Sequence, residues 1–403
     1  RDECPRPARP ALRQLGLKRT RVRDLGPLQG MPLTRLDLSG AGGVHRIDSL
    51  EGMPLEWLSL SATRVDTLEA LRGMPLEKLH LGATPVADLG PLAGMPLSTL
   101  LAERTRIEDL QPLAGMSLKV LTLQHTKVDD IGPLRDMPLT RLDLSHTRVK
   151  DLRALAGAPL AELSLERTRV RDLTPLKGMS LVELTLDHTA VRDLTPLAGM
   201  PLVILWLNRT KVTDLSPLRG MPLVSLQLDH TGVRDLAPLV GMRLAVLRLK
   251  RTKVEDLSAL AGMPLSVLDL SRTKVRDISP IKGAPLKQLD LKLSQVADLS
   301  PLEGKALSWL NISYTPVKDL KALKSMQLVS LMIGETDIED FSGLRDMTVR
   351  HLYIFNSSLD DLSVLEHMRL RKLHLYMNPV SDVSPLRGMP IEFLNLSRTK
   401  VTD

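Results

Sequence analysis

The segment Gly40–His45 has the residue types of a phosphate-binding loop. Its sequence, GAGGVH, places three glycines within four residues, and glycine-rich turns that open a helix cradle phosphate groups with their backbone N–H groups. A phosphate loop also needs a following Lys-Ser or Lys-Thr pair and a helical pattern, and neither follows here. We therefore interpret the segment as a bulge that absorbs a one-residue insertion.

Metal and nucleophile chemistry has few candidates in this sequence. His351 and His374 could be neighbours across two strands, but two histidines supply only half of a tetrahedral zinc site. Cys4, the one cysteine, stands in the Pro-rich lead CPRPARP with no convincing base nearby. A recurrent aspartate column, exemplified by Asp214, is better explained by capping of helical turns than by Ca²⁺ binding. The residue types thus predict no enzyme, no catalytic residue, no metal and no cofactor.

The composition limits the kind of fold that positions these residues. The chain has 403 residues, 43% of them apolar, and a formal net charge of +7. One cysteine excludes an internal disulfide framework, so packing must stabilise the fold. No apolar run reaches the roughly 20 residues that cross a bilayer. The positive charge permits an acidic partner without requiring one.

A 21-residue unit repeats along almost the whole chain. One copy, MPLVILWLNRTKVTDLSPLRG, runs from Met200 to Gly220, and its Met-Pro-Leu step or a close variant recurs every 21 residues after Met53. The one spacing of 22, from Met31 to Met53, contains the Gly40–His45 insertion. Leu-x-Leu has the two-residue period of a short strand, and Asp-Leu-Ser-Pro-Leu has the capping aspartate and early proline of a helical turn. One unit cannot bury its leucines alone, so the pattern predicts stacked units stabilised by nearest-neighbour interfaces.

The pattern Leu-x-x-Leu-x-Leu-x-x-Thr-x-Val resembles the leucine-rich repeat, Leu-x-x-Leu-x-Leu-x-x-Asn-x-Leu. Its Asp-Leu-x-Pro-Leu tail is similar to the bacterial internalin-like subclass with 21-residue units. The resemblance implies an α/β solenoid, a leucine-rich-repeat horseshoe with a concave parallel β-sheet and a convex side of short helical (3-10) turns. Threonine fills the usual asparagine column, and Asn378 alone restores it. A hydroxyl makes fewer backbone bonds than an amide, which predicts a weaker or differently bonded turn ladder.

The repeats also define the expected domain organisation. Residues 12–403 form a single solenoid of about nineteen units, truncated at Asp403, and residues 1–11 form an N-terminal lead that we interpret as the remnant of a cap or linker. The family's cysteine-rich caps are missing, which suggests a piece of a longer protein. Four Asn-x-Ser/Thr sequons lie where glycans would block the expected sheet, which favours a bacterial intracellular location over secretion.

A basic ridge is expected beside the strands. Just after each strand, nine successive units hold only Arg or His, and most units add Lys or Arg two residues later; at a strand spacing of about 4.8 Å, the ridge is roughly 40 Å long. Four histidines (His125, His146, His188 and His230) make its charge sensitive to pH near 6.5. The ridge is either a track for an anionic partner or a solvated edge whose long side chains cover the leucine core. Its cations are Arg104, Arg106, Lys127, Arg148, Arg167, Arg169, Arg209, Lys211, Arg251, Lys253, Arg272 and Lys274.

An aromatic patch is expected in the last quarter of the chain. Ile354 and Leu375 occupy leucine columns, so the rings beside them should point out of the core on the concave face. Phe341 differs, because it replaces a core leucine and should pack inside. Exposed rings and methionines across five neighbouring strands form the kind of surface that soluble proteins rarely leave without a partner. The patch comprises Trp309, Tyr314, Met332, His351, Tyr353, Phe355, His374, Tyr376, Met377 and Phe393.

These columns predict a non-catalytic recognition module that binds a protein ligand, mainly through the aromatic patch, with the basic ridge as a secondary contact. One alternative is a scaffold that binds nucleic acid or another polyanion on the ridge, although only Trp206 could stack bases there. Another is the sensor or regulatory arm of a larger signalling enzyme, such as a bacterial Ser/Thr kinase, because similar arrays are often appended to such enzymes. A third alternative is that a further domain of the protein packs over the aromatic patch. The oligomeric state is left open.

Overall fold

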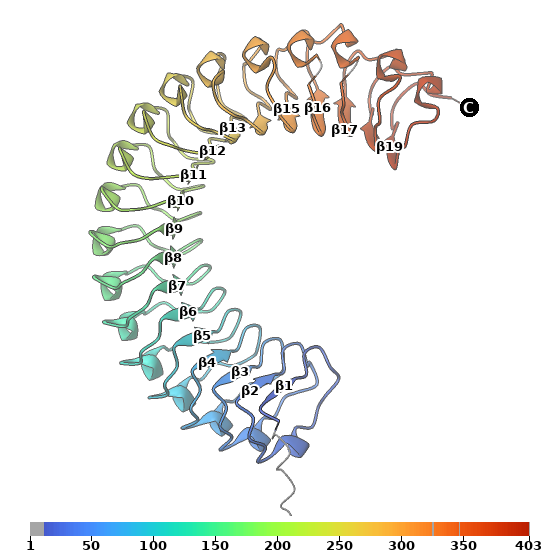
Figure 1. Cartoon of the computed structure of the whole chain (residues 1–403). Helices are drawn as coiled ribbons and strands as arrows, with labels where there is room; N and C mark the ends of the chain where they lie inside the picture. Colours follow the sequence, from blue (N-terminus) through green and yellow to red (C-terminus); the bar gives the residue numbers. More distant parts are fainter. Residues whose placement is uncertain (1–11, 325, 346, 403) are drawn as a thin grey trace, which may run out of the picture. The chain divides into compact units, whose positions relative to one another are not determined.

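The computed structural model of the chain describes residues 12–324, 326–345 and 347–402. The chain divides into two compact units, Arg1–Val191 and Arg192–Asp403, which are described separately below as unit 1 and unit 2. Within either unit, short strands line one side and single turns of 3-10 helix line the opposite side (Figure 1). The N-terminal lead with Cys4 lies outside the described residues, and a single domain over residues 12–403 stays a prediction.

Unit 1 contains nine strands and eight 3-10 helices among its described residues. The strands are β1 (Gln14–Gly16), β2 (Arg35–Asp37), β3 (Trp57–Ser59), β4 (Lys78–His80), β5 (Thr99–Leu101), β6 (Val120–Thr122), β7 (Arg141–Asp143), β8 (Glu162–Ser164) and β9 (Glu183–Thr185). The 3-10 helices are η1 (Gly26–Leu28), η2 (Asp48–Leu50), η3 (Glu69–Leu71), η4 (Gly90–Leu92), η5 (Gln111–Leu113), η6 (Gly132–Leu134), η7 (Arg153–Leu155) and η8 (Thr174–Leu176).

Unit 2 contains ten strands and ten 3-10 helices among its described residues. The strands are β10 (Ile204–Trp206), β11 (Ser225–Gln227), β12 (Val246–Arg248), β13 (Val267–Asp269), β14 (Gln288–Asp290), β15 (Trp309–Asn311), β16 (Ser330–Gly334), β17 (His351–Phe355), β18 (Lys372–His374) and β19 (Phe393–Asn395). The 3-10 helices are η9 (Thr195–Leu197), η10 (Ser216–Leu218), η11 (Ala237–Leu239), η12 (Ser258–Leu260), η13 (Ser279–Ile281), η14 (Ser300–Leu302), η15 (Lys321–Leu323), η16 (Ser342–Leu344), η17 (Leu362–Leu365) and η18 (Ser384–Leu386).

Consecutive strands pair in parallel within each unit, and their register follows the sequence repeat. Ile204 pairs with Ser225, 21 residues later. The pairing of Arg35 with Trp57 spans 22 residues, so the extra residue of Gly40–His45 is absorbed between β2 and β3 without a slip of the leucines. The interpretation of this segment as a bulge that absorbs the insertion is confirmed.

Most of the described 3-10 helices begin beside a side chain that accepts a hydrogen bond from the first backbone N–H of the helix. The exceptions are η2, which Arg46 precedes, and η17, where Asp361 accepts from the second helical residue. In the reference repeat, Asp214 Oδ1 accepts from the N–H of Ser216 at 2.8 Å and from the Ser216 hydroxyl at 2.6 Å. The aspartate stands one residue before the helix cap, Leu215, so the motif is an Asx turn rather than a direct N-cap. Thr67 replaces the aspartate in its repeat and accepts from Glu69 N–H at 3.4 Å. Capping by this column is therefore confirmed, with this change of geometry.

The core lies between the strand side and the 3-10 side and consists of the leucine columns. In the reference repeat, Leu202, Leu205 and Leu207 are fully buried, and Leu215 is 1% exposed. Most of the methionines that precede the strands are also buried, as Met200 shows at 3%. Phe341, at 5%, packs inside as expected. Because alternate strand residues point to opposite faces, burial of these columns places the residues between them on the outer sheet face.

The threonine column is bonded differently from its one asparagine. The buried Thr210 hydroxyl donates to the Leu207 carbonyl at 2.7 Å, a bond within one repeat. Asn378 Nδ2 donates both to Leu375 O at 2.9 Å and to Ile354 O of the preceding repeat at 2.8 Å. Its Oδ1 accepts from the Ser357 hydroxyl at 2.7 Å. The amide thus links neighbouring repeats, whereas the threonine hydroxyl closes its own turn, as the difference in bonding capacity predicts.

Candidate partner-binding site

Six rings of the aromatic patch form two stacked rows on the outer sheet face of unit 2. In the first row, the ring centroids of Tyr353 and His374 are 4.6 Å apart, and those of His374 and Phe393 are 4.7 Å apart. In the second row, Phe355 and Tyr376 stack at 5.2 Å with 6° between their planes, and Tyr314 meets Phe355 at 5.9 Å. These distances lie in the range in which aromatic pairs add stability beyond burial. The first row crosses β17, β18 and β19. In the second row Phe355 ends β17, whereas Tyr314 and Tyr376 follow the ends of β15 and β18.

Two longer strands and one glycine position the second row. β16 and β17 have five residues where the other described strands have three, which extends the sheet as far as Phe355. Gly334 pairs with Phe355 in register, and a Cβ at Gly334 would lie 2.5 Å from Cε2 and Cζ of the Phe355 ring. The ring therefore lies across Gly334 and reaches Tyr314, one repeat beyond. A side chain at position 334 would keep the two rings apart.

The exposure of the rings is graded across the patch. Phe393 is 47% exposed and Tyr314 38%, whereas Tyr353, Phe355 and Tyr376 are half-buried. The half-buried rings lie outside the leucine core, and their loss of exposure comes from stacking on neighbouring rings. Rows of this kind present ring edges and partly covered faces to a partner. Because stacking already fixes the ring orientations, this apolar surface is pre-organised for binding.

The remaining members of the predicted patch lie on the same strands or their ends without a ring contact among the described residues. Trp309 begins β15, Met332 lies in β16 and His351 begins β17, and all three are half-buried. Met377 follows β18 and is 38% exposed. They enlarge the apolar area around the two rows, but the structure does not bring them into the rows.

Charged side chains that lie near the rings include Lys292, Lys372 and Glu335. Lys292 Nζ lies 5.4 Å from the Tyr314 ring centroid, a cation–π distance. Burial lowers the pKa of His374, with Lys372 adding to the effect, so its ring is neutral at pH 7. Burial raises the pKa of the Tyr376 hydroxyl, which stays protonated. The centre of the patch is therefore uncharged near neutral pH.

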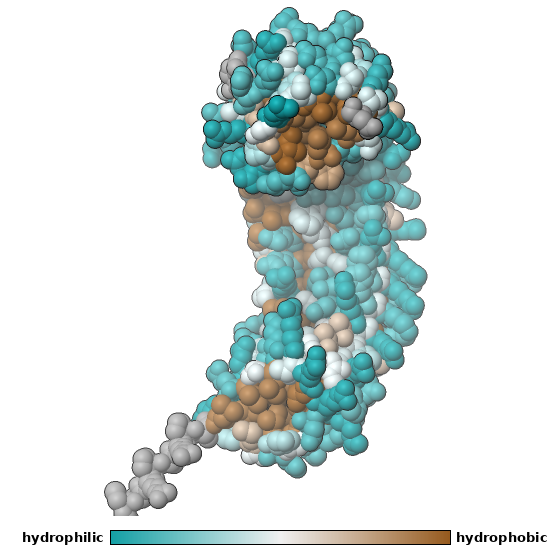
Figure 2. All heavy atoms as spheres, turned by 90° about the vertical axis from the view of Figure 1, so that its right-hand side faces the viewer, coloured by the Kyte–Doolittle hydropathy of each residue, from teal (hydrophilic) through white to brown (hydrophobic). Residues whose placement is uncertain are grey.

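The end of unit 2 that carries β19 is apolar as well. Figure 2 shows apolar atoms gathered there, at the upper end of that view. Leu394 is 41% exposed although it stands in a leucine column, because β19 is hydrogen-bonded only to β18 among the described strands. Phe393 therefore belongs both to the first ring row and to this end.

In unit 1, the basic ridge is partly neutralised. His125 and His146 stack with their centroids 4.0 Å apart. Burial and then the charge of His146 lower the pKa of His125. Glu166 Oε1 lies 3.7 Å from His146 Nε2 and 3.5 Å from Arg167 Nε, and Glu108 holds Lys127 at 2.7 Å. These contacts favour the solvated-edge interpretation for this part of the ridge.

In unit 2, the ridge lies beside buried carboxylates. Burial, followed by the charge of Asp269, raises the pKa of Asp229 to about 6. Burial also raises the pKa of Asp290 to about 6, and Asp290 pairs with Asp269 in register. Around pH 6 these carboxyls are half protonated, so they offset less of the neighbouring cationic charge than ordinary aspartates would.

The backbone of the ridge column has an unexpected conformation. Arg209 has φ 57°, Arg251 56° and Arg272 60°, in the left-handed region that favours glycine. The same turn position takes φ 60° at Tyr314 and at Met377. Every described repeat except the one with Gly40 thus places a side-chain-bearing residue where a Cβ costs energy, and this turn directs the ridge and part of the patch.

Unit 1 carries a ring cluster that the sequence analysis missed. Arg35 Cζ lies 3.8 Å from the Trp57 ring centroid, a cation–π contact, and the His80 ring meets Trp57 edge-on at 5.1 Å. The three residues lie on β2, β3 and β4, one per strand. Their signal was present in the sequence as outer-face positions of three successive repeats.

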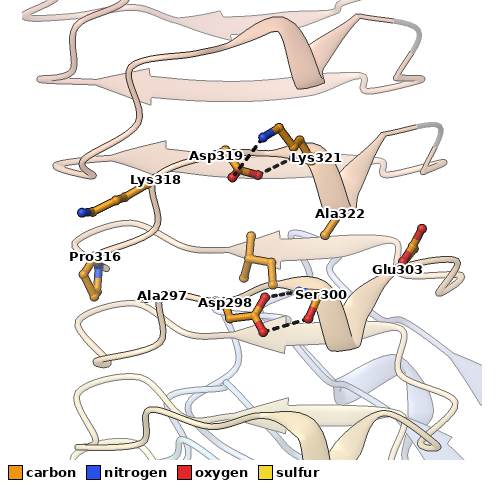
Figure 3. A pocket seen from close by; sticks show the side chains of 10 residues that line it. Ala297, Asp298, Ser300, Glu303, Pro316, Lys318, Asp319, Lys321 and Ala322 are labelled. Carbon is orange, nitrogen blue, oxygen red and sulfur yellow. Dashed lines mark hydrogen bonds and ion pairs between the residues drawn. The ribbon is translucent and has the colours of Figure 1, made fainter.

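Pockets and metal sites add no catalytic candidate in the described part of the chain. A hollow of about 400 Å³ lies between η14 and η15, and Figure 3 shows that its aspartates are engaged, Asp298 with Ser300 and Asp319 with Lys321. No group of three or more metal-ligating side chains occurs among the residues that the structure describes. His351 pairs in register with Lys372 and not with His374, whose ring is sandwiched by Tyr353 and Phe393.

A membrane-spanning helix is also not found. Among the described residues, every helix is too short and too polar to cross a bilayer.

Comparison with known proteins defines the fold. No protein-family model matches the chain. No curated protein matches it. An internalin (inlF) from Listeria monocytogenes is similar in structure, with a TM-score of 0.60 and 24% identity over 73% of this chain and 85% of the internalin. A leucine-rich-repeat protein from Leptospira interrogans, LIC12759, is similar with a TM-score of 0.61 and 17% identity over 94% of each chain. The plant peptide hormone receptor RGFR1, solved in complex with RGF2, is similar with a TM-score of 0.63 and 15% identity over 97% of this chain and 81% of the receptor.

The likeness agrees with the repeating strand and 3-10 turn in each unit. The chain has the fold of a leucine-rich-repeat solenoid, with parallel strands on one side and 3-10 turns on the other. At these identities the comparison speaks for the fold alone, and the function is argued from the surface of this chain.

Proposed function

We propose that this protein is a non-catalytic recognition module that binds a protein partner through the aromatic patch of unit 2. The observation that carries the proposal is the pair of stacked ring rows, Tyr353–His374–Phe393 and Tyr314–Phe355–Tyr376. Tyrosine and other aromatic residues dominate interface hot spots because they bury a large area with few rotatable bonds.

The low entropic cost of ordering these side chains on binding favours this surface as an interface. The rings are already held by stacking, so a partner would meet side chains that lose little rotamer freedom on binding. The patch centre is uncharged at neutral pH, as the lowered pKa of His374 indicates. A binding face with an apolar centre and a charged border, here Lys292, has the usual anatomy of a protein interface.

The test compares capture of protein partners by the wild-type chain and by a Tyr353→Ala/Tyr376→Ala variant, which removes one ring from each row. Proteins retained from a lysate are identified, and the best candidate is purified and titrated. We expect the double variant to weaken affinity for that partner at least a hundredfold, since two hot-spot truncations cost about 2 kcal/mol or more each.

The matched control is Trp206→Ala, because Trp206 is 36% exposed on the outer face of β10, outside the patch. It removes a comparable ring without touching either row and should leave affinity unchanged. Unaltered binding by the double variant, or an equal loss in the Trp206 variant, would overturn the proposal.

A second candidate function is polyanion binding on the unit 2 part of the basic ridge. The observation in its favour is the left-handed turn: Arg209, Arg251 and Arg272 keep long cationic side chains where glycine would avoid strain. A polyanion bound there would lose affinity steeply with salt, whereas a partner on the aromatic patch would not. Titration of the identified ligand at 50 and 200 mM salt separates the two surfaces.

The finer assignment is that the repeats belong to the bacterial internalin-like subclass. Its support is the 21-residue unit with its Asp-Leu-x-Pro-Leu tail, whose aspartate and proline begin a 3-10 turn. A role as the sensor arm of a larger signalling enzyme is compatible with the same surface, since the partner would then be another part of that enzyme. The similar plant receptor is in complex with RGF2, one precedent for recognition by this fold.

A further inference from the structure

The one-residue insertion at Gly40–His45 creates a hollow in unit 1. The hollow has a volume of about 620 Å³ and is lined by Thr20, Arg21, Arg23, Gly42, Gly43, His45 and Arg64. Three arginines and a histidine, all exposed, thus line one open surface hollow, and none of the described lining residues carries a carboxylate. This arrangement is independent of the aromatic patch, which lies in unit 2.

The glycines explain why these side chains converge. Arg21 and Arg64 stand in the same repeat column on either side of Gly43, and all three residues line the hollow. A Cβ at Gly43 would lie 2.6 Å from Arg23 Cγ, so the aliphatic part of Arg23 passes over the glycine. His45 Nδ1 lies 3.3 Å from the Gly43 carbonyl, which holds the imidazole at the edge of the hollow.

One acidic residue close to the loop in sequence is already engaged. Asp48 bonds Arg46 Nε at 2.8 Å, and neither residue is among those that line the hollow. The lining arginines therefore present excess positive charge to whatever enters. Guanidinium groups form paired, parallel hydrogen bonds with phosphate and sulfate oxygens, which makes clustered arginines the usual receptors of such groups.

We infer that this hollow binds a phosphate or sulfate group, either as the free ion or as part of a small ester. The sequence GAGGVH is not a phosphate loop of the helix-opening kind, because the next helix, η2, is a single 3-10 turn that begins at Asp48. The anion is held instead by the side chains of Arg21, Arg23 and Arg64. The hollow is open to solvent and has a volume of about 620 Å³, which leaves room for an ester substituent.

The test is isothermal titration calorimetry of the full chain with inorganic phosphate, inorganic sulfate and phenyl phosphate at constant ionic strength. We expect saturable binding by the wild-type chain, with the three titrations showing whether the free ions or the ester bind more tightly. An Arg21→Gln/Arg64→Gln variant should lose at least tenfold in affinity for the tightest of them.

The control variant is Arg135→Gln/Arg219→Gln, which removes two arginines and therefore the same charge. Both are exposed residues that directly follow the 3-10 helices η6 and η10, and neither lines the hollow or belongs to the basic ridge. The control should bind the anion as the wild-type chain does. An equal loss in both variants would show a general charge effect and overturn the inference, as would the absence of saturable heat with all three probes.

A second pair of variants acts on the hollow without removing an arginine. No atom lies within 4 Å of a Cβ at Gly42, so a side chain fits there. Gly42→Asp should abolish binding by placing a carboxylate among the cations, while the isosteric Gly42→Asn should retain most of it. Equal behaviour of the two variants contradicts the inference. Circular dichroism of each variant confirms that the repeats remain folded.

Discussion

The ring of Phe355 lies across Gly334 on the neighbouring strand, in the space that a side chain at position 334 would fill. A Cβ at Gly334 would lie 2.5 Å from Cε2 and Cζ of the ring and 2.6 Å from Cδ2. The ring reaches over the glycine to Tyr314, and Tyr376 covers its other side. One missing side chain therefore joins three repeats into a single row of rings.

Gly334→Ala should displace the Phe355 ring. We expect a loss of about 1–3 kcal/mol in the free energy of unfolding, the usual cost of overpacking, measured by urea denaturation. The same substitution in a Phe355→Ala background should cost little, because the clash is gone. A cost that persists in that background would show that backbone conformation at position 334, and not the ring, requires glycine.

Asn378→Thr should cost more than the loss of an ordinary threonine hydroxyl. The substituted threonine keeps the bond to the Leu375 carbonyl but loses those to Ile354 O and Ser357. Leaving such buried groups unpaired costs about 1–3 kcal/mol, which urea denaturation measures. Thr252→Val, which removes one hydroxyl bond inside a repeat, is the comparison and should cost about 1 kcal/mol. Faster amide exchange at Ser357 in the Asn378 variant would locate the loss between the two repeats.

Stability of unit 2 should depend on the protonation of Asp290. Burial raises its pKa to about 6 in the folded chain, whereas an unfolded aspartate titrates near 3.9. Between about pH 4 and pH 6 the folded state therefore binds more protons, so this group's contribution to stability falls as pH rises through that window. Asp290→Asn, which is neutral throughout, should gain on the order of 1 kcal/mol over the wild-type chain at pH 7.5 and little at pH 4, after allowance for solvent screening.

The control for this pH dependence is Asp256→Asn. The hydrogen bonds from Ser258 lower the pKa of the Asp256 carboxyl, so its charge stabilises the fold above the unfolded pKa. This variant should gain nothing at pH 7.5, although it removes the same charge. The midpoints of urea denaturation are measured for both variants at pH 4 and pH 7.5. An equal gain in stability for the two variants at pH 7.5 would point to net charge, and not to burial of Asp290, as the cause.

The left-handed turn position should discriminate between side chains of equal charge. Arg251 has φ 56°, a conformation that asparagine tolerates and that β-branched residues avoid. Arg251→Val should lower the free energy of unfolding by about 1–2 kcal/mol relative to Arg251→Asn, as measured by urea denaturation. The two variants remove the same cation, so a difference reports the backbone alone. Equal stability would mean that the turn relaxes when the side chain changes.

Much of the surface could be assigned from the sequence because the repeat supplies the register. Leu205 and Leu207 are buried and Trp206 between them is exposed, as strand alternation requires. The same alternation placed Tyr353 and Phe355 outside the core. Strand alternation could not predict contacts between residues of different repeat columns. His374 stacks on Phe393, which belongs to a different column, and Tyr314 meets Phe355 across an intervening strand.

The amino-acid sequence by itself determined the strand, the 3-10 turn and the 21-residue register, because these depend on short-range periodicity, capping and proline geometry that repeat in every unit. Only the tertiary structure decided which outer-face side chains touch, where a glycine such as Gly334 or Gly43 admits a neighbour, and that Arg209 and its equivalents take a left-handed turn. These features depend on the direction and packing of side chains from different repeats. Spacing along the chain carries no information about them.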